Sequence, residues 1–535
     1  MAKRFKIHPG IGFARVGPSE QGFFIDGERL GDPPFELNGN GEAVEFTGYK
    51  DASFLIRRQA ARFRVYEYDV DDASHVETFV GEVSATDGAR IEWSVKLVNS
   101  KASGPLMRAS APGSGGFDGE RVVLPHPSRF RNPDSSLPAG FTRDDLKASV
   151  ELSVNGVNQA PARTTGTIAG NSIFLGEVRT DAEGRLVVLG GEGRSGSWLN
   201  PAPSLNSFLN NTGWFDDVAD GPVDARVTLA DGTSFDAVGA WVVVGSPDFA
   251  PHVTPIITLY DVAANAMHNK GTQAIPNPLS YQEDIKPFVQ RAADLYWVNS
   301  ASAWSDVREL LADEGDNLRD PTSGADDLRD DGFEAIIAAE TDLSQFRFPP
   351  MQRKILEMWR DGDFVPGPVA RPAETEVQLL DRVSLTAGIG GGFFPGIEAG
   401  FLLTEPSVYS EFGRVTRGKF TDHDGTVRDF EPGILTQRMA LPWQADFNDC
   451  NGDWWPAQRP DLARFDEDGN TNTDSFGNDV GHRWTRGVSA ENNTPVERAS
   501  MVEEVARLGV IVETDIGGEL VQAESGRDPA LDTGA

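Results

Sequence analysis

Hydrophobic and polar residues alternate along the first half of the chain in short runs separated by turn-forming residues. Residues 91–98, Ile-Glu-Trp-Ser-Val-Lys-Leu-Val, place every second side chain on one apolar face, which is the period of a half-buried strand. Residues 225–232 end in Asp-Gly, a dipeptide typical of β-hairpin turns. Repeated over residues 1–262, this pattern predicts antiparallel sheets packed as a sandwich or a long meander.

Helical periodicity replaces this alternation from about residue 280. Apolar residues recur at helical intervals in residues 281–291 and 303–312, and residues 350–359 read as one amphipathic helix whose Met and Trp side chains belong to the core. Residues 313–331 are rich in Asp, Gly and Arg and are expected to form an exposed acidic loop. We therefore expect an α+β protein with a β-rich N-terminal region (1–262), a mainly helical region (263–380) and a helical and mixed C-terminal region (381–535).

Composition excludes several classes of partner. The chain has 535 residues, enough for a large buried core, and a net charge of −34. Nucleic acids and anionic membranes bind clustered Lys and Arg, so neither is an expected partner. Residues 385–403 are apolar but hold six glycines, and the basic start lacks the apolar segment of a secretory signal. We expect a soluble protein, cytoplasmic or exported without a standard signal; the compartment stays open.

Conventional catalytic and metal-binding motifs are missing from the sequence. No two of the seven histidines stand at the spacing of a helical zinc site, so no metal centre is expected. Residues 388–396 are rich in glycine but lack the Lys-Ser/Thr of a P-loop and the spacing of a Rossmann turn. Residues 466–474 are dense in oxygen-bearing side chains, but their glycine is out of place for an EF-hand, which favours a solvated acidic loop.

Cys450 is the only cysteine and cannot form an internal disulfide. A Cys-His hydrolase with His482 or His423 as base is one interpretation. It requires an accessible thiolate, whereas the aspartates at positions 446, 449 and 453 would raise the pKa of this thiol. Two tryptophans, at positions 454 and 455, follow closely and suggest a different chemistry, in which the sulfur is joined to an oxidised tryptophan.

The surroundings of Cys450 form part of a longer series of recognisable blocks. Residues 441–450 read Leu-Pro-Trp-Gln-Ala-Asp-Phe-Asn-Asp-Cys, and further blocks lie at 7–17, 184–191, 213–223, 240–244, 258–261, 394–398 and 454–460. In content and order these blocks resemble the lysine ε-oxidase and glycine oxidase family, the cysteine tryptophylquinone-dependent amine oxidases. The resemblance extends over nearly the whole chain.

This resemblance implies a cofactor made from the protein itself, cysteine tryptophylquinone, in which a tryptophan is oxidised to an ortho-quinone and bonded to a cysteine sulfur. It implies oxidative deamination of a primary amine with O2 to give an aldehyde or oxo acid, NH3 and H2O2. Cys450 matches the cysteine of the family, and Asp446 matches the aspartate that serves as general base. Glycine, the side-chain amine of lysine and related amines are all open as substrates.

The quinone tryptophan is expected to be Trp484. In the family this residue lies well after the cysteine, and Trp484 is the only tryptophan beyond Trp455. Two departures stand against this: Trp484 follows Cys450 more closely than in the best-studied relatives, and Val505 occupies a position where we expect a family tryptophan. The alternative function is therefore a noncatalytic binding or scaffold protein that keeps the fold without a mature quinone.

Two further side chains and two partners complete the expectations. The resemblance makes His482 a candidate for orienting the substrate or the quinone, although an ordinary satisfied histidine explains it equally well. Tyr260 is a candidate for lining the pocket, against the simpler interpretation of a buried aromatic residue. The resemblance also implies a flavoprotein maturation enzyme that adds oxygen to the tryptophan. A homo-oligomer is compatible with the sequence.

Overall fold

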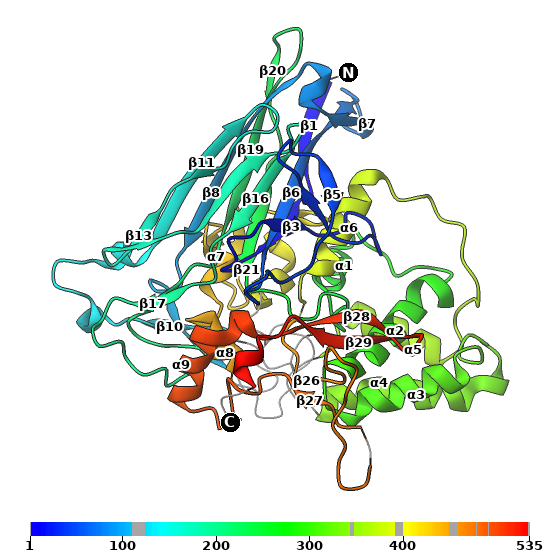
Figure 1. The fold of residues 1–535 in the computed structure, drawn as a ribbon. Helices are drawn as coiled ribbons and strands as arrows, with labels where there is room; N and C mark the ends of the chain where they lie inside the picture. The colour runs from blue at the N-terminus through cyan, green and yellow to red at the C-terminus, as the bar shows by residue number, and fades with distance from the viewer. Residues whose placement is uncertain are drawn as a thin grey trace.

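The N-terminal half is built on one large, mainly antiparallel sheet (Figure 1). The computed structural model describes residues 2–109, 123–342, 347–390, 400–448, 457–477, 479–490 and 492–532. Among these residues, fifteen strands share the sheet. Its hydrogen-bonded path runs β11 (Ala148–Asn155), β8 (Arg90–Asn99), β19 (Ala219–Thr228), β21 (Ala240–Gly245), β2 (Ile11–Arg15), β6 (Arg58–Val70), β16 (Leu186–Gly190), β15 (Gly176–Thr180) and β12 (Ala162–Arg163). Off this path lie β1 (Ala2–His8), β3 (Phe23–Ile25), β4 (Phe35–Leu37), β5 (Ala43–Glu45), β7 (Glu77–Val83) and β20 (Ser234–Asp236).

Burial along the strands follows the alternation in the sequence. In β11 buried and exposed residues alternate without exception, and its partner β8 buries Ile91, Trp93 and Val95 on one face. The central strands β16 and β21 are buried along their whole length, because both faces of the sheet are covered there. Strand β19 turns back into β20 through Leu229–Thr233, as the Asp-Gly dipeptide predicts. The expected β-rich N-terminal half is thus confirmed.

Helices dominate the chain after the sheet and gather beside its lower end in Figure 1. The amphipathic segment at 350–359 is helical, and residues 281–291 are a π-helical turn (Tyr281–Ile285) followed directly by an α-helix. The α-helices are α1 (Leu259–Asn269), α2 (Lys286–Asp294), α3 (Ser302–Glu314), α4 (Asp326–Asp342), α5 (Pro350–Arg360), α6 (Glu376–Ala387), α7 (Ile434–Gln437), α8 (Trp443–Asn448) and α9 (Pro495–Glu504). Short 3₁₀ turns cover Ala85–Asp87, Asp134–Ser136, Arg143–Leu146, Leu295–Trp297, Ser323–Ala325, Gly400–Thr404, Pro406–Val408, Val505–Arg507 and Pro529–Leu531.

The acidic stretch at 313–331 is more ordered than its composition indicated. Helix α4 begins at Asp326, so the last residues of the stretch are helical. The Arg329 side chain is fully buried and donates hydrogen bonds to the carbonyl oxygens of Thr322 and Arg360. Asp326, one turn earlier, pairs with the same guanidinium. The hydrogen bonds of Arg329 therefore order part of a segment whose low apolar content had predicted an exposed loop.

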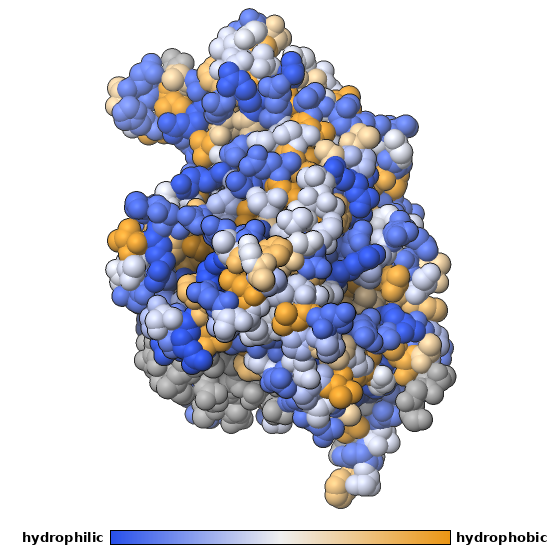
Figure 2. Space-filling view, turned by 90° about the vertical axis from the view of Figure 1, so that its left-hand side faces the viewer, coloured by the Kyte–Doolittle hydropathy of each residue, from blue (hydrophilic) through white to orange (hydrophobic). Residues whose placement is uncertain are grey.

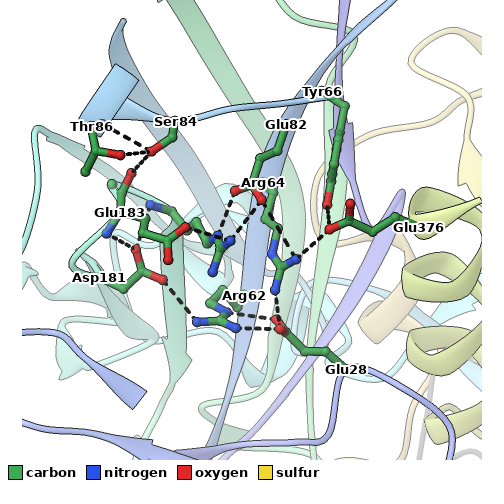
Figure 3. Close-up of polar contacts among 12 residues, drawn as sticks. Glu28, Arg62, Arg64, Tyr66, Glu82, Ser84, Thr86, Asp181, Glu183 and Glu376 are labelled. Atoms are coloured by element: carbon green, nitrogen blue, oxygen red, sulfur yellow. Dashed lines mark hydrogen bonds and ion pairs between the residues drawn. The ribbon is translucent and has the colours of Figure 1, made fainter. Parts of the chain in front are cut away.

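A layer of charged side chains fastens helix α6 to the sheet (Figure 3). Arg62 and Arg64, both on β6, converge on the carboxylate of Glu28, and Arg62 also binds Asp181 at 3.1 Å. On the other side, Arg64 Nη1 lies 3.2 Å from Glu376 at the start of α6, and the Tyr66 hydroxyl donates to the same carboxylate at 2.9 Å. These contacts fix α6, whose last residues border a cavity of about 520 Å³.

The C-terminal part adds small two-stranded sheets around the short helices α7, α8 and α9. The pairs are β22 (Tyr409–Glu411) with β23 (Arg414–Val415), β24 (Lys419–Thr421) with β25 (Val427–Asp429), β26 (Leu462–Ala463) with β27 (His482–Arg483), and β28 (Val510–Ile516) with β29 (Glu519–Ser525). Similar pairs in the N-terminal half are β9 (Pro105–Ala109) with β10 (Val123–Phe130), β13 (Gly166–Ile168) with β14 (Asn171–Ile173), and β17 (Ser195–Ser197) with β18 (Trp214–Asp216). The expected helical and mixed C-terminal half is confirmed.

Hydrophilic residues cover most of the face shown in Figure 2, and hydrophobic residues are scattered singly or in small groups. Within the described residues, no helix has the length and apolar character needed to cross a bilayer. One core of buried side chains extends from the sheet into the helices and includes Trp241, Trp304, Trp443 and Trp484.

Candidate functional site

Helix α8, which carries Asp446, is buried along its whole length. Its first residue, Trp443, donates its backbone N–H to Asp216 Oδ2 at 3.0 Å. The Gln444 side chain accepts from Ser195 Oγ at 2.6 Å and donates to the Gly193 carbonyl oxygen at 3.1 Å. Only 2% of Asp446 is exposed. A short helix deep in the protein is thus held in place by residues of the N-terminal half.

The carboxylate that holds α8 belongs to a buried charged cluster. The ammonium group of Lys101 binds Asp216, and both side chains are fully buried. Burial lowers the pKa of Lys101 to about 8, against the attraction of Asp216. Burial also raises the pKa of the neighbouring Asp217 to about 7, and the charge of Asp216 raises it further. The site therefore rests on charges that are sealed from water and balance one another.

Trp484 is fully buried. Its indole Nε1 donates to the Gly509 carbonyl oxygen at 2.9 Å, and its backbone N–H donates to the Asp461 carbonyl oxygen at 3.1 Å. The guanidinium of Arg459 sits 5.8 Å from the centre of the indole ring. These contacts hold the indole in one orientation.

Phe249 and Arg459 connect Trp484 to α8. The Phe249 ring lies 4.9 Å from the Trp484 ring and 6.1 Å from the ring of Phe447, which follows Asp446 on α8. Arg459 Nε donates to the Phe447 carbonyl oxygen at 2.8 Å while its guanidinium lies near the indole. Phe249 and Arg459 therefore each contact both Trp484 and Phe447, the residue that follows Asp446 on α8.

His482 and Tyr260 make other contacts. The two ring nitrogens of His482 lie 3.2 Å from Asn472 Nδ2 and 3.1 Å from the Asn470 carbonyl oxygen, so this histidine holds the neighbouring loop. The Tyr260 ring, on α1, packs edge-on against Phe412 at 5.4 Å, with the Arg382 guanidinium 5.3 Å from its centre. Burial raises the pKa of the Tyr260 hydroxyl. The predicted roles of both residues stay predictions.

Cys450, Trp454 and Trp455 lie outside the described residues. The residues before and after them nevertheless carry buried polar atoms with no hydrogen-bond partner in the described part of the chain. These atoms are both side-chain amide atoms of Asn448, Nε1 of Trp443 and Oε1 of Gln458, and at most 2% of each of these residues is exposed. Unpaired buried polar groups are rare because they are costly. The two donors among them, Trp443 Nε1 and Asn448 Nδ2, fit a site built around an additional group that bears polar oxygens, such as a quinone.

Val505, where a family tryptophan was expected, is buried in the turn after α9. Helix α9, which precedes this turn, packs against α8. Among the residues that the structure describes, no three His, Cys, Asp or Glu side chains are grouped to hold a metal ion.

Several residues of this site could not be identified from the sequence. Asp216 lies in one of the recognised blocks, but nothing in its sequence context showed that it binds α8. Lys101 and Phe249 carried no signal at all, because their importance comes from contacts with residues far away in sequence. A buried lysine is recognisable only when its partner is known.

Comparison with known proteins agrees with the blocks found in the sequence. Residues 8–244 match the family model of the L-lysine epsilon oxidase N-terminal domain, and residues 338–468 match that of the C-terminal domain. The L-lysine 6-oxidase of Marinomonas mediterranea is 26% identical over 597 aligned positions, which cover 93% of this chain and 78% of the relative. Trp484 lies beyond both matched stretches.

The fold is likewise that of solved structures. The crystal structure of the L-Lys epsilon-oxidase from Marinomonas mediterranea superposes with a TM-score of 0.73 at 22% identity, covering 98% of this chain and 94% of the other. The structure of the Schiff base intermediate of that enzyme with L-Lys gives 0.72 at 22% identity, with 98% and 95% covered. At this identity the likeness establishes the shared fold.

Proposed function

The chain belongs to the L-lysine epsilon oxidase family, and from that membership we propose that it is an amine oxidase that acts on the CH–NH2 group of a primary amine with oxygen as acceptor. The products are an aldehyde or oxo acid, NH3 and H2O2. The observation that carries the proposal is the placement of Asp446 on a buried helix, four residues before Cys450. Phe249 and Arg459 connect this helix to Trp484, because each contacts both Phe447 and the indole ring.

Asp446 is the proposed general base. Burial on α8 keeps bulk water away from its carboxylate, and the fixed helix holds the carboxylate in a defined position. A carboxylate placed in this way removes a proton from the carbon next to the substrate nitrogen, a step that contributes about 10²–10⁴-fold to the rate. Anchoring of α8 by Asp216 and Gln444 fixes the position from which Asp446 acts.

Cys450 and Trp484 are the residues proposed to form cysteine tryptophylquinone. When formed, this group supplies an electrophilic carbonyl, which ordinary side chains lack. The unpaired Nδ2 of Asn448 supports the proposal, because it is a hydrogen-bond donor buried just before the segment that contains Cys450. Arg459 and Phe249 both contact the indole of Trp484, at 5.8 Å and 4.9 Å from its ring centre.

The partners of the protein follow from this chemistry. Formation of the quinone requires that oxygen atoms be added to a buried tryptophan. We assign this oxygenation to a flavoprotein maturation enzyme that is encoded separately. The substrate is a small primary amine or an amino acid, with glycine and the lysine side chain among the candidates. The second candidate function, a scaffold without a mature quinone, is favoured by one observation: Val505 stands where a family tryptophan was expected.

Peroxide release tests the base and the function together. The protein is produced with its maturation partner and assayed with lysine, glycine and simple alkylamines, beside the variants Asp446→Asn and Asp144→Asn. The Asp144 side chain is 89% exposed on the surface and serves as the matched control. We expect Asp446→Asn to lower turnover about 10²–10⁴-fold and Asp144→Asn to leave it unchanged.

Other outcomes separate the alternatives. Full turnover in Asp446→Asn overturns the base assignment but leaves the oxidase intact. An unmodified protein mass together with no peroxide from any amine favours the scaffold.

A further inference from the structure

Arg459 places a buried positive charge over the ring of Trp484. Only 3% of Arg459 is exposed, and its guanidinium carbon lies 5.8 Å from the centre of the indole, which is itself fully buried. A charge in such a dry site acts on its neighbours more strongly than it would in water. Any negative charge that develops on this ring is therefore stabilised by the guanidinium.

Hydrogen bonds hold the guanidinium in place. Arg459 Nε donates to the Phe447 carbonyl oxygen at 2.8 Å, and Nη1 donates to the Pro460 carbonyl oxygen at 3.2 Å. Phe447 lies in the last turn of α8, where carbonyl oxygens lack partners within the helix. Arg459 thus joins the end of the helix that carries Asp446 to Trp484. A charge fixed in this way needs no rearrangement when the ring gains electrons.

Asp461 is the counterion of Arg459. Its Oδ1 accepts from Arg459 Nη1 at 3.0 Å, its Oδ2 accepts from Asn299 Nδ2 at 2.8 Å, and its carbonyl oxygen accepts the backbone N–H of Trp484. The pair is unequal, because the side chain of Asp461 is 17% exposed and that of Arg459 only 3%. Water screens the carboxylate more than the guanidinium, so the pair leaves a positive field at the ring.

A second arginine near Trp484 belongs to a balanced cluster. Arg527 Nη1 donates to the Trp484 carbonyl oxygen at 3.0 Å, so its contact is with the backbone. Arg527 and Arg486 both pair with Glu524 and Asp532, which sets two cations against two anions. This cluster therefore fixes the position of Trp484 without adding a net charge beside it.

The proposed chemistry changes the charge of this ring. Full reduction of an ortho-quinone takes up two electrons and two protons, and the product is an anion when one of these protons is not taken up. In turnover the two electrons come from the amine, which is oxidised at its CH–NH2 group, and pass to O2, which is reduced to H2O2. A fixed cation stabilises the electron-rich form relative to the quinone.

We propose that Arg459 raises the reduction potential of the quinone formed on Trp484, so that the ring withdraws electrons from the amine more readily. Asp461 limits this effect by partly neutralising the guanidinium. This inference rests on the proposed oxidase function and names a residue that sets its driving force.

The reduction potential of the mature protein tests this role directly. Spectroelectrochemical titration at pH 7 follows the absorbance of the quinone. Arg459→Gln should lower the equilibrium constant of the two-electron reduction at least about tenfold, which is about 30 mV. Arg459→Lys keeps the charge and should stay within about threefold of the wild type. Arg417→Gln is the matched control, because Arg417 lies 5.6 Å from the ring centre of another tryptophan, Trp241, and should change the constant less than about twofold.

A variant of the counterion should act in the opposite direction. Asp461→Asn removes the negative charge but keeps an oxygen for Arg459 and Asn299 and the carbonyl oxygen that binds Trp484. We expect it to raise the equilibrium constant about threefold or more. An unchanged or lowered constant contradicts the proposal, and this comparison decides the matter when Arg459→Gln does not fold or mature.

The outcomes separate this inference from the cofactor assignment. An unchanged potential in matured Arg459→Gln overturns the role of Arg459. An equal loss in Arg459→Lys also overturns it, since packing and not charge would then set the potential. Peptide mapping of the wild type is carried out in parallel. A linked Cys450–Trp484 peptide without these shifts contradicts only the role of Arg459, whereas an unlinked wild type contradicts the cofactor and this inference together.

Discussion

The carboxylate of Asp216 accepts the backbone N–H of Trp443 at 3.0 Å, and this hydrogen bond ties the first residue of α8 to β18 in the N-terminal half. The same carboxylate pairs with Lys101 and accepts a hydrogen bond from Asn99 Nδ2 at 3.1 Å. The proposed base and the cysteine follow on this helix and in the segment after it. Their position is therefore set by a salt bridge that is more than two hundred residues away in sequence.

Removal of Lys101 should destabilise the protein strongly. In Lys101→Met the buried charge of Asp216 loses its counterion, which costs about 3–5 kcal/mol of unfolding free energy. Lys96→Met is the matched control, because Lys96 is 42% exposed in a surface pair with Glu151 and should cost less than about 1 kcal/mol. Urea unfolding at neutral pH measures both. Equal costs for the two variants would contradict a sealed ion pair beneath α8.

Asp217 should make stability fall as the pH rises. Its pKa is about 7 in the folded protein, raised by burial from 3.8, so between these values the folded state binds more protons than the unfolded state. The contribution of Asp217 to the free energy of unfolding is therefore largest below about pH 4, falls between about pH 4 and pH 7, and is constant above about pH 7. Asp217→Asn removes this dependence while keeping an oxygen for the N–H groups of Glu192 and Arg194.

The measurement for Asp217 is the difference in unfolding free energy between variant and wild type at several pH values. We expect the variant to gain on the order of 2–4 kcal/mol relative to the wild type between about pH 4 and pH 8. A difference that is constant over this range, or that changes in the opposite direction, would show that Asp217 is ionised when folded.

Replacement of Asn448 should lower the turnover of the matured enzyme but leave the free energy of unfolding of the unmatured protein nearly unchanged. Its buried amide has no hydrogen-bond partner among the described residues, so Asn448→Leu should change the unfolding free energy of unmatured protein by no more than about 1 kcal/mol. In Asn265→Leu, the control, the Met351 N–H loses its acceptor, at a cost of about 1–3 kcal/mol. In matured protein Asn448→Leu should lower turnover at least about tenfold. Wild-type turnover would remove Asn448 from the site.

Elements with strong periodicity could be predicted from the sequence, and long-range contacts could not. The alternation at 91–98 and the amphipathic stretch at 350–359 became β8 and α5, because each pattern reports which face is buried. The acidic stretch at 313–331 was misread in part, because the carbonyl oxygens that Arg329 caps are invisible in composition.

The site shows the same division. Asp446 and Cys450 were singled out by a contiguous motif that resembles a known family. The pairing of Lys101 with Asp216, and the meeting of Asp26, Asp248 and Gln458 in one cavity, arise from segments that only the fold brings together. No local pattern marks such residues, since their chemistry depends on burial and on partners far along the chain.

Replacement of Trp484 should abolish peroxide release, whereas its effect on the free energy of unfolding should match that of replacing another buried tryptophan. Trp484→Phe loses the hydrogen bond to Gly509 and part of the ring packing, at about 1–3 kcal/mol. Trp359→Phe is a matched control, because Trp359 is also fully buried and donates Nε1 to the Leu318 carbonyl oxygen at 3.1 Å. Both variants should fold with similar losses, measured by chemical denaturation, but only Trp484→Phe should lose peroxide release. Loss in both, or in neither, would contradict the assignment.

The central claim is that Cys450 and Trp484 form one cross-linked cofactor. Peptide mapping by mass spectrometry of protein produced with its native maturation partner tests it most directly. The account predicts a single linked peptide pair joining Cys450 to Trp484, with a gain of oxygen and a loss of hydrogen relative to the unmodified sequence. A free, unmodified Cys450 peptide together with an unmodified Trp484 peptide in that material would contradict it.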